Sequence, residues 1–201
     1  DQGQKKITEV KTFNVPFALE KIKENININS SSETSKEKII NQAIQFHLKG
    51  NISEAAKYYQ YFINQGFLDH RVFSNYGIIL NDLGKLQDAQ LSQRKAIELN
   101  PDFAQAHSNL GIILKDLGKL QEAEFSYRKA IEISPNSAEA HSNLGSILSN
   151  VGNLPEAESS QRKAIELKPD FAEAYSNLGI ILKDIGHLKE AELSYRKAIE
   201  L

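Results

Sequence analysis

Apolar residues recur at helical spacing along most of the chain. One clear run lies near the middle of the sequence and consists of Leu110, Ile113, Leu114 and Leu117. Steps of three and four residues place side chains on one face of an α-helix. The run stops at Gly118, and a glycine at that place can take the left-handed conformation that ends a helix. We therefore predict a helix that ends at this glycine.

A second apolar run follows directly. It begins at Leu120 and carries Ala123, Tyr127, Ala130 and Ile131 on one stripe. Pro135 then closes it, because proline cannot continue a helix interior. The two runs predict a helical hairpin whose helices cross at small residues, Gly111 on the first and Ala123 on the second. Larger side chains at the crossing should overpack the hairpin and destabilise it by roughly 1–3 kcal/mol.

This hairpin pattern recurs every 34 residues. The sequence Ser-Asn-X-Gly begins at Ser74, Ser108, Ser142 and Ser176, and Pro101, Pro135 and Pro169 recur at the same interval. Five units follow, at 36–69, 70–103, 104–137, 138–171 and 172–201, the last of them truncated. Residues 1–35 do not repeat, and we interpret them as an N-terminal arm and linker. A period of this length is typical of repeat proteins, in which each repeat is one supersecondary unit.

Polar residues three apart precede the first helix of most units. The pairs are Thr34 with Glu37, Asp102 with Gln105, Asn136 with Glu139 and Asp170 with Glu173. This spacing is typical of a capping box, in which the first side chain accepts a hydrogen bond from a free backbone N–H at the helix start. We therefore predict that the first helices begin at these pairs.

Small residues, a helix-breaking glycine, two alanines and a proline at fixed places in a 34-residue unit resemble the tetratricopeptide repeat. The resemblance covers residues 36–201, and only the first unit departs, with Phe62 in place of alanine and Phe67 in place of proline. It implies an all-α fold, a right-handed α-solenoid of antiparallel helix pairs that forms a superhelix. It also implies a role in holding another polypeptide.

One asparagine per unit lies on the stripe opposite the buried one: Asn41, Asn75, Asn109, Asn143 and Asn177. We predict that these amides face water and bind peptide groups, because an amide offers both a donor and an acceptor. With first helices about 10 Å apart, a guest rising about 3.3 Å per residue meets one asparagine every third residue. The row resembles the array of the O-linked N-acetylglucosamine transferase family, whose asparagines line the concave face. Copying of the unit is the second explanation of the row.

Two further rows flank the asparagines. Ile78, Ile112 and Ile180, interrupted by Ser146, are predicted to form an apolar floor for the guest. The alternative is packing against the next unit. Asp82, Asp116 and Asp184, with Asn150 at the fourth place, complete the candidate peptide-binding residues, with a solvated helix end as the alternative.

The composition argues against several classes of function for this chain. With 24 basic and 26 acidic side chains the net charge is -2, which gives no reason to expect nucleic acid or a membrane as partner. The aliphatic stretches are far shorter than the roughly 18 residues of a membrane span. Cysteine is absent, which fits a reducing, cytoplasmic location. No histidine has a second metal ligand four residues away. We therefore predict no catalytic site, no metal and no cofactor in this fragment.

The two ends leave several readings open. In the arm, Phe13, Val15 and Phe17 alternate as in a strand, and the segment either caps the first hairpin or occupies a groove of its own or another copy. The pattern stops mid-unit at Leu201, so we expect further repeats or a catalytic domain beyond it. An interaction scaffold for an extended polypeptide is the first functional prediction. The alternatives are a substrate-recruiting arm of a larger transferase or oxygenase and a self-assembling solenoid.

Overall fold

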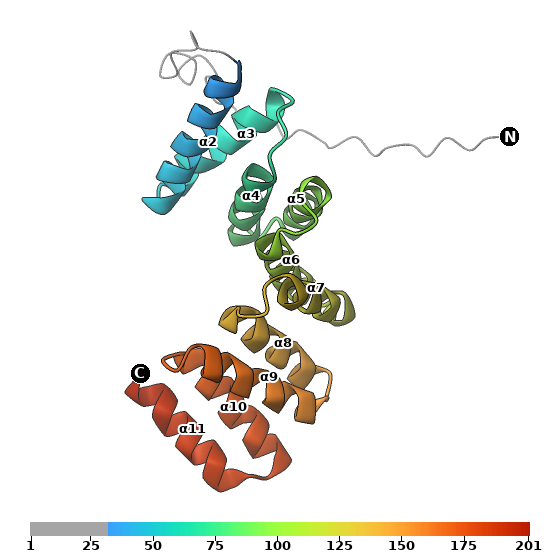
Figure 1. Ribbon diagram of the computed structural model, residues 1–201, viewed down its shortest axis with the longest axis vertical. Coiled ribbons are helices and arrows are strands. Elements are labelled where there is room, and N and C mark those ends of the chain that lie inside the picture. Colours follow the sequence, from blue (N-terminus) through green and yellow to red (C-terminus); the bar gives the residue numbers. More distant parts are fainter. Residues whose placement is uncertain (1–31) are drawn as a thin grey trace, which may run out of the picture. The chain divides into compact units, whose positions relative to one another are not determined.

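The computed structural model describes residues 32–201, and the predicted arm before residue 32 lies outside them. In the described part ten helices follow one another: α2 Ser32–Leu48, α3 Ile52–Asn64, α4 His70–Asp82, α5 Leu86–Leu99, α6 Ala104–Asp116, α7 Leu120–Ile133, α8 Ala138–Asn150, α9 Leu154–Leu167, α10 Ala172–Ile185 and α11 Leu188–Glu200. They pack as antiparallel pairs, one pair in each predicted unit (Figure 1). The all-α prediction is confirmed.

Residues 32–61 belong to a unit of their own, built from α2 and most of α3. Apolar residues from both helices are buried in it, among them Ile39, Ala43, Ala55 and Tyr59. The rings of Phe46 and Tyr58 lie 5.3 Å apart between the two helices. Helix α2 begins at Ser32, so the last residues of the predicted linker are helical and Thr34 lies inside the helix rather than before it.

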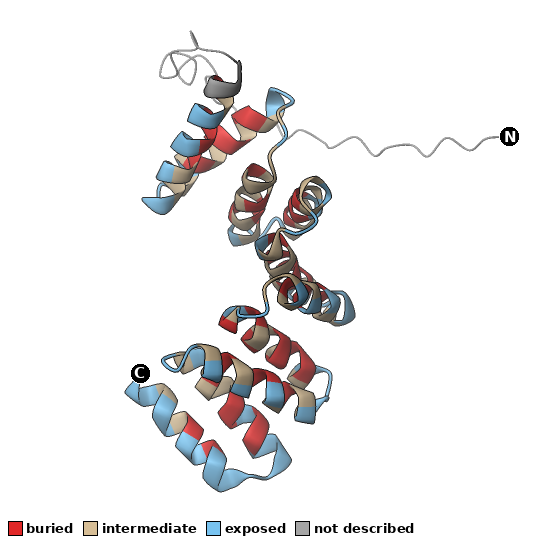
Figure 2. Cartoon of the chain, in the orientation of Figure 1, coloured by how far each residue is buried: buried red, intermediate tan, exposed pale blue. Residues whose placement is uncertain are grey.

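Residues 62–201 form the second unit, in which each helix from α4 to α11 contacts the next. One apolar cluster joins three hairpins and contains Leu110 on α6, Tyr127 on α7, Leu144 and Leu148 on α8, and Ile181 on α10. The buried residues lie on the sides that paired helices turn toward each other (Figure 2). Each fully buried leucine or isoleucine contributes roughly 1.5–3 kcal/mol. The hairpins are thus held by the apolar stripes that the sequence places at steps of three and four.

Two glycines carry the predicted hairpin geometry. Gly118 has φ 73° just after α6, which confirms the left-handed helix end. Gly111 lies at the crossing of α6 and α7, where an added Cβ atom would stand 2.7 Å from the ring of Tyr127. Ala123 opposite is fully buried, as predicted for the crossing.

The predicted capping boxes are wrong. The residues before α6 and α10 are Phe103 and Phe171, and neither caps its helix with a side chain. Each helix begins later than the box requires, because Asp102 and Asp170 belong to the preceding turn, where their carbonyl oxygens accept from the second residue along. Before α8 the cap is Ser137, which accepts from the backbone N–H of Ala140 at 3.2 Å.

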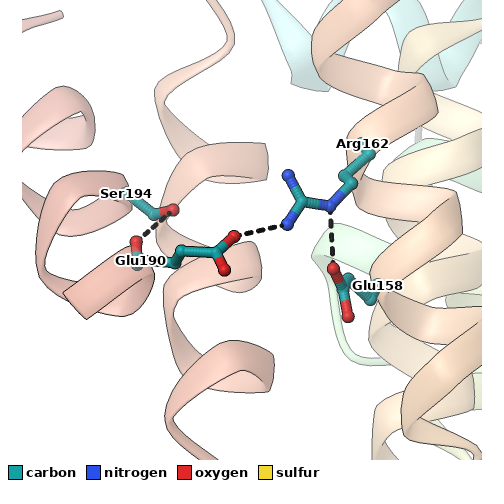
Figure 3. Close-up of polar contacts among 4 residues, drawn as sticks. All are labelled: Glu158, Arg162, Glu190 and Ser194. Atoms are coloured by element: carbon teal, nitrogen blue, oxygen red, sulfur yellow. Dashed lines mark hydrogen bonds and ion pairs between the residues drawn. The ribbon is translucent and has the colours of Figure 1, made fainter. Parts of the chain in front are cut away.

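Ion pairs connect the second helices of successive hairpins. Arg162 on α9 donates from Nε to Glu158 at 2.8 Å and from Nη2 to Glu190 on α11 at 2.9 Å (Figure 3). Arg128 on α7 reaches Glu156 on α9 in the same way, at 2.7 Å. Such half-exposed pairs contribute at most about 1 kcal/mol each. Their effect is to fix how one hairpin is seated on the next.

Candidate functional site

The predicted asparagines differ in their exposure. Asn41 is exposed, in the first unit, while Asn75, Asn143 and Asn177 are half-buried on α4, α8 and α10. Asn109 on α6 is only 6% exposed. The prediction that all five amides face water is therefore wrong at Asn109. An alignment of the chain with itself at 34 residues could not show this, because burial there depends on how α6 packs against α4.

Both ends of the Asn109 amide are used inside the array. Gln105, one turn earlier on α6, donates from Nε2 to Asn109 Oδ1 at 3.0 Å. Asn109 Nδ2 in turn donates to Ser74 Oγ on α4 at 3.2 Å. Ser74 is 1% exposed, so this bridge between two first helices is buried at one end. Among residues 35–201, the side-chain amides of Asn75, Asn143 and Asn177 make no hydrogen bond.

The flanking rows lie on the same helices. Ile78 and Ile112 are half-buried, and Ile112 packs against the apolar cluster that joins the third, fourth and fifth hairpins, while Ile180 is 46% exposed. The aspartates lie at or near the helix ends, exposed: Asp82, Asp116 and Asp184. In the second unit, neighbouring first helices contact each other, so their outer sides are adjacent. We call this surface of α4, α6, α8 and α10 the first-helix face. Peptide binding by its residues stays a prediction.

A second period was missed in the sequence. The residue that packs against the crossing glycine alternates along the chain: Gln93, Tyr127, Gln161 and Tyr195. Gln93 Nε2 donates to the Ser74 carbonyl at 2.9 Å, and Gln161 Nε2 donates to the Ser142 carbonyl at 2.8 Å. At this position hairpins therefore correspond 68 residues apart rather than 34. The signal was present in the alternation of Ser-Gln-Arg-Lys and Ser-Tyr-Arg-Lys.

The other polar groups that we considered have structural partners. His107 and His141 donate from Nε2 to the carbonyls of Pro101 and Pro135, at 2.9 and 3.0 Å. Within residues 32–201 no group of three or more histidine and carboxylate side chains is placed to hold a metal ion. None of the helices in this part is both long and apolar enough to cross a membrane.

One shallow depression lies on the last two hairpins. It has a volume of about 370 Å³ and is lined by residues of α9, α10 and α11, including Ile165, Leu178 and Leu193. None of the predicted site residues lines it. The first-helix face therefore remains the candidate site because of its side-chain amides, and no cavity in the described part of the chain supports that choice.

The hydrogen bonds of Asn109 lead to a stability prediction. Asn109→Ala should lower the free energy of unfolding by about 1–2 kcal/mol, because it removes two hydrogen bonds and leaves the buried Ser74 hydroxyl unpaired. Asn143→Ala, the same change one hairpin later, should change it by less than about 0.5 kcal/mol. Urea unfolding followed by circular dichroism measures both. Equal effects of the two substitutions would contradict the bridge.

Comparisons with known proteins agree with the hairpins. The tetratricopeptide repeat family matches residues 104–137 in one model, residues 126–159 and 161–192 in a second, and residues 77–118 in a third. A search of curated proteins found no match.

Solved structures share the fold. A crystal structure of MamA superposes with a TM-score of 0.70 at 25% identity, over 79% of this chain and 92% of that one. MamA of Desulfovibrio magneticus RS-1 superposes with a TM-score of 0.72 at 22% identity, over 83% of this chain and 94% of that one. YrrB, described as a TPR protein with an unusual peptide-binding site, superposes with a TM-score of 0.68 at 22% identity, over 92% of each chain.

The family models together match residues 77–159 and 161–192, which is more than half of the sequence. The same stretch forms the helix pairs α4 to α11, and all the solved structures above have a fold of this kind. This chain belongs to the tetratricopeptide repeat family.

Proposed function

We propose that the chain is a protein–protein interaction scaffold that binds an extended polypeptide along the first-helix face. Tetratricopeptide repeats in general mediate protein–protein interactions. The observation that carries the proposal is the set of half-buried amides of Asn75, Asn143 and Asn177, which make no hydrogen bond in the described part of the chain. An amide without an internal partner, on a surface of contacting helices, is available to a guest.

The chemistry of an amide suits a guest of varied sequence. Its carbonyl accepts from a backbone N–H and its NH2 group donates to a backbone carbonyl, so neither contact reads a guest side chain. First helices about 10 Å apart match every third residue of an extended chain that rises about 3.3 Å per residue. Ile78 and Ile180 would offer apolar contact beside the amides, and Asp184 a charge at the helix end.

Two likenesses support this proposal. The Ser-Asn-X-Gly pattern resembles the array of the O-linked N-acetylglucosamine transferase family, in which such asparagines line the concave face. YrrB, which shares the fold, is described as having a peptide-binding site. A substrate-recruiting arm of a larger enzyme would use the same surface in the same way, so the proposal includes that case.

The test uses peptides selected from a random-sequence phage library, about twelve residues long so that they span several helices. The triple variant Asn75→Ala, Asn143→Ala, Asn177→Ala should bind the selected peptides at least about tenfold more weakly, because several peptide hydrogen bonds are lost. Its helical content by circular dichroism should be unchanged. The dissociation constant is measured by fluorescence anisotropy.

The control variant is Asn64→Ala with Asn136→Ala, two exposed asparagines outside the first helices, and its affinity should equal that of the unchanged chain. Equal affinity of the triple variant and the control would contradict the proposal, and so would a library that yields no peptide. Light scattering on the same samples measures the mass. A mass that rises with concentration would favour the alternative of self-association, for which exposed Leu193 and Ile199 on α11 are available.

A further inference from the structure

Two places on the first-helix face are copies of each other, 68 residues apart. At the first, between α4 and α6, lie Ser74, Gln105 and Asn109; the corresponding residues between α8 and α10 are Ser142, Glu173 and Asn177. In both pairs the first helices contact each other. Both serines are buried, and the carbonyl of each accepts from a glutamine of its own hairpin, at 2.9 and 2.8 Å. The backbone around the two serines is thus held in the same way.

The side chains at the two places nevertheless differ in their hydrogen bonds. At the first place Gln105, Asn109 and Ser74 form a continuous chain of bonds. At the second place the hydroxyl of Ser142, in a residue only 2% exposed, has no hydrogen-bond partner. In the described residues neither Asn177 nor Glu173 makes a side-chain hydrogen bond. A buried hydroxyl without a partner is unfavourable by about 1–3 kcal/mol.

One substitution between the copies explains the difference. Gln105 has an NH2 group, which fixes the Asn109 carbonyl and leaves the Asn109 NH2 group to donate to Ser74. A glutamate carboxylate has no proton to donate at neutral pH, so Glu173 cannot fix the carbonyl of Asn177 in this way. The first place is closed by its own glutamine. At the second place no side chain of the described residues donates to the Asn177 carbonyl, and a guest can do so.

Resting on the function proposed above, we infer that a backbone N–H of the guest binds Asn177 in the role that Gln105 Nε2 has at Asn109. The Asn177 NH2 group then donates to Ser142, and the buried hydroxyl gains its missing partner. Binding is concentrated on α8 and α10, and Gln105 is the residue that closes the equivalent place on α4 and α6. The ligand is an extended segment with a free backbone N–H at this position, so proline there is excluded.

The place between α6 and α8 is of another kind. Its serine, Ser108, is half-buried. The hairpin that contains this serine has Tyr127 against its crossing glycine, where the hairpins of Ser74 and Ser142 have glutamine. The serine at the position that corresponds to Ser74 is therefore not fully buried there. Asn143 serves as an ordinary contact of the face.

The test exchanges the two residues. Glu173→Gln should weaken binding of the selected peptides about tenfold, because the new glutamine closes the Asn177 amide. Glu173→Ala loses the same charge but adds no donor, so its affinity should stay within about twofold of the unchanged chain. In NMR spectra, the side-chain NH2 signals of Asn177 in Glu173→Gln should come to resemble those of Asn109 in the unchanged chain. This readout needs no peptide.

The reverse change checks the closed place. In the unchanged chain Asn109→Ala should leave peptide affinity unaltered, whereas in a Gln105→Ala background it should weaken binding about fivefold. Equal affinities of Glu173→Gln and Glu173→Ala overturn the inference, as does a loss for Asn109→Ala equal to that for Asn177→Ala. In both cases the proposed function stands, provided that the triple asparagine variant still binds more weakly. If that variant binds normally, the proposed function itself fails.

Discussion

Gly111→Ala should destabilise the array by about 2 kcal/mol, whereas Gly77→Ala, the same substitution one hairpin earlier, should change stability by less than about 1 kcal/mol. At Gly111 the new Cβ atom would lie 2.7 Å from two atoms of the Tyr127 ring. That ring is rigid and fully buried, so the two helices themselves must separate. The better helix propensity of alanine, up to about 1 kcal/mol, offsets only part of this overlap.

At Gly77 the obstacle is of a different kind. The nearest atom is Nε2 of Gln93, at 2.6 Å, which is the end of a flexible side chain. Moving it weakens one hydrogen bond to the Ser74 carbonyl, an effect of about 1 kcal/mol that the gain in helix propensity nearly cancels. Midpoints of urea unfolding measure the two variants against the unchanged chain. Equal shifts would mean that the ring of Tyr127 does not set the spacing of its hairpin.

The helices could be predicted from the sequence better than their exact ends. Helices and hairpins were predictable because apolar spacing, a glycine such as Gly118 and a proline such as Pro135 act within a few residues. The predicted caps were wrong because the helix starts one residue later, which moves Asp102 from the N-cap position into the preceding turn. Local pattern therefore determines which segments are helical, and leaves their ends less certain.

The candidate site was harder to predict because it depends on contacts between units. Five asparagines look alike in a 34-residue alignment of the chain with itself, yet Asn109 is bonded to Ser74 on another helix and the amide of Asn177 has no bond in the described residues. The difference comes from the residue four positions earlier, glutamine in one case and glutamate in the other. An alignment of the chain with itself at an offset of 68 residues would have revealed this difference. Apolar periodicity carries no information about it.

Alkaline pH should destabilise the array through Tyr127. Burial, with a smaller effect from the charge of Asp116, raises the pKa of Tyr127 far above its ordinary value. In the unfolded chain this tyrosine ionises near pH 10, while in the folded chain it stays neutral. Its contribution to stability is therefore fully present below about pH 10 and is lost as the pH rises further, by about 1.4 kcal/mol per unit for this one group.

Tyr127→Phe isolates this effect. The Tyr127 hydroxyl is buried without a hydrogen-bond partner, so at about pH 8, where tyrosines are neutral, its removal should raise the free energy of unfolding by about 1 kcal/mol. At about pH 11 the advantage of phenylalanine should grow by a further 1 kcal/mol or so, because phenylalanine does not ionise. Lysines and the other tyrosines titrate in both chains and cancel in the difference between them. Urea unfolding at the two pH values measures that difference, and a constant gap would show that the ring of Tyr127 reaches water in the folded array.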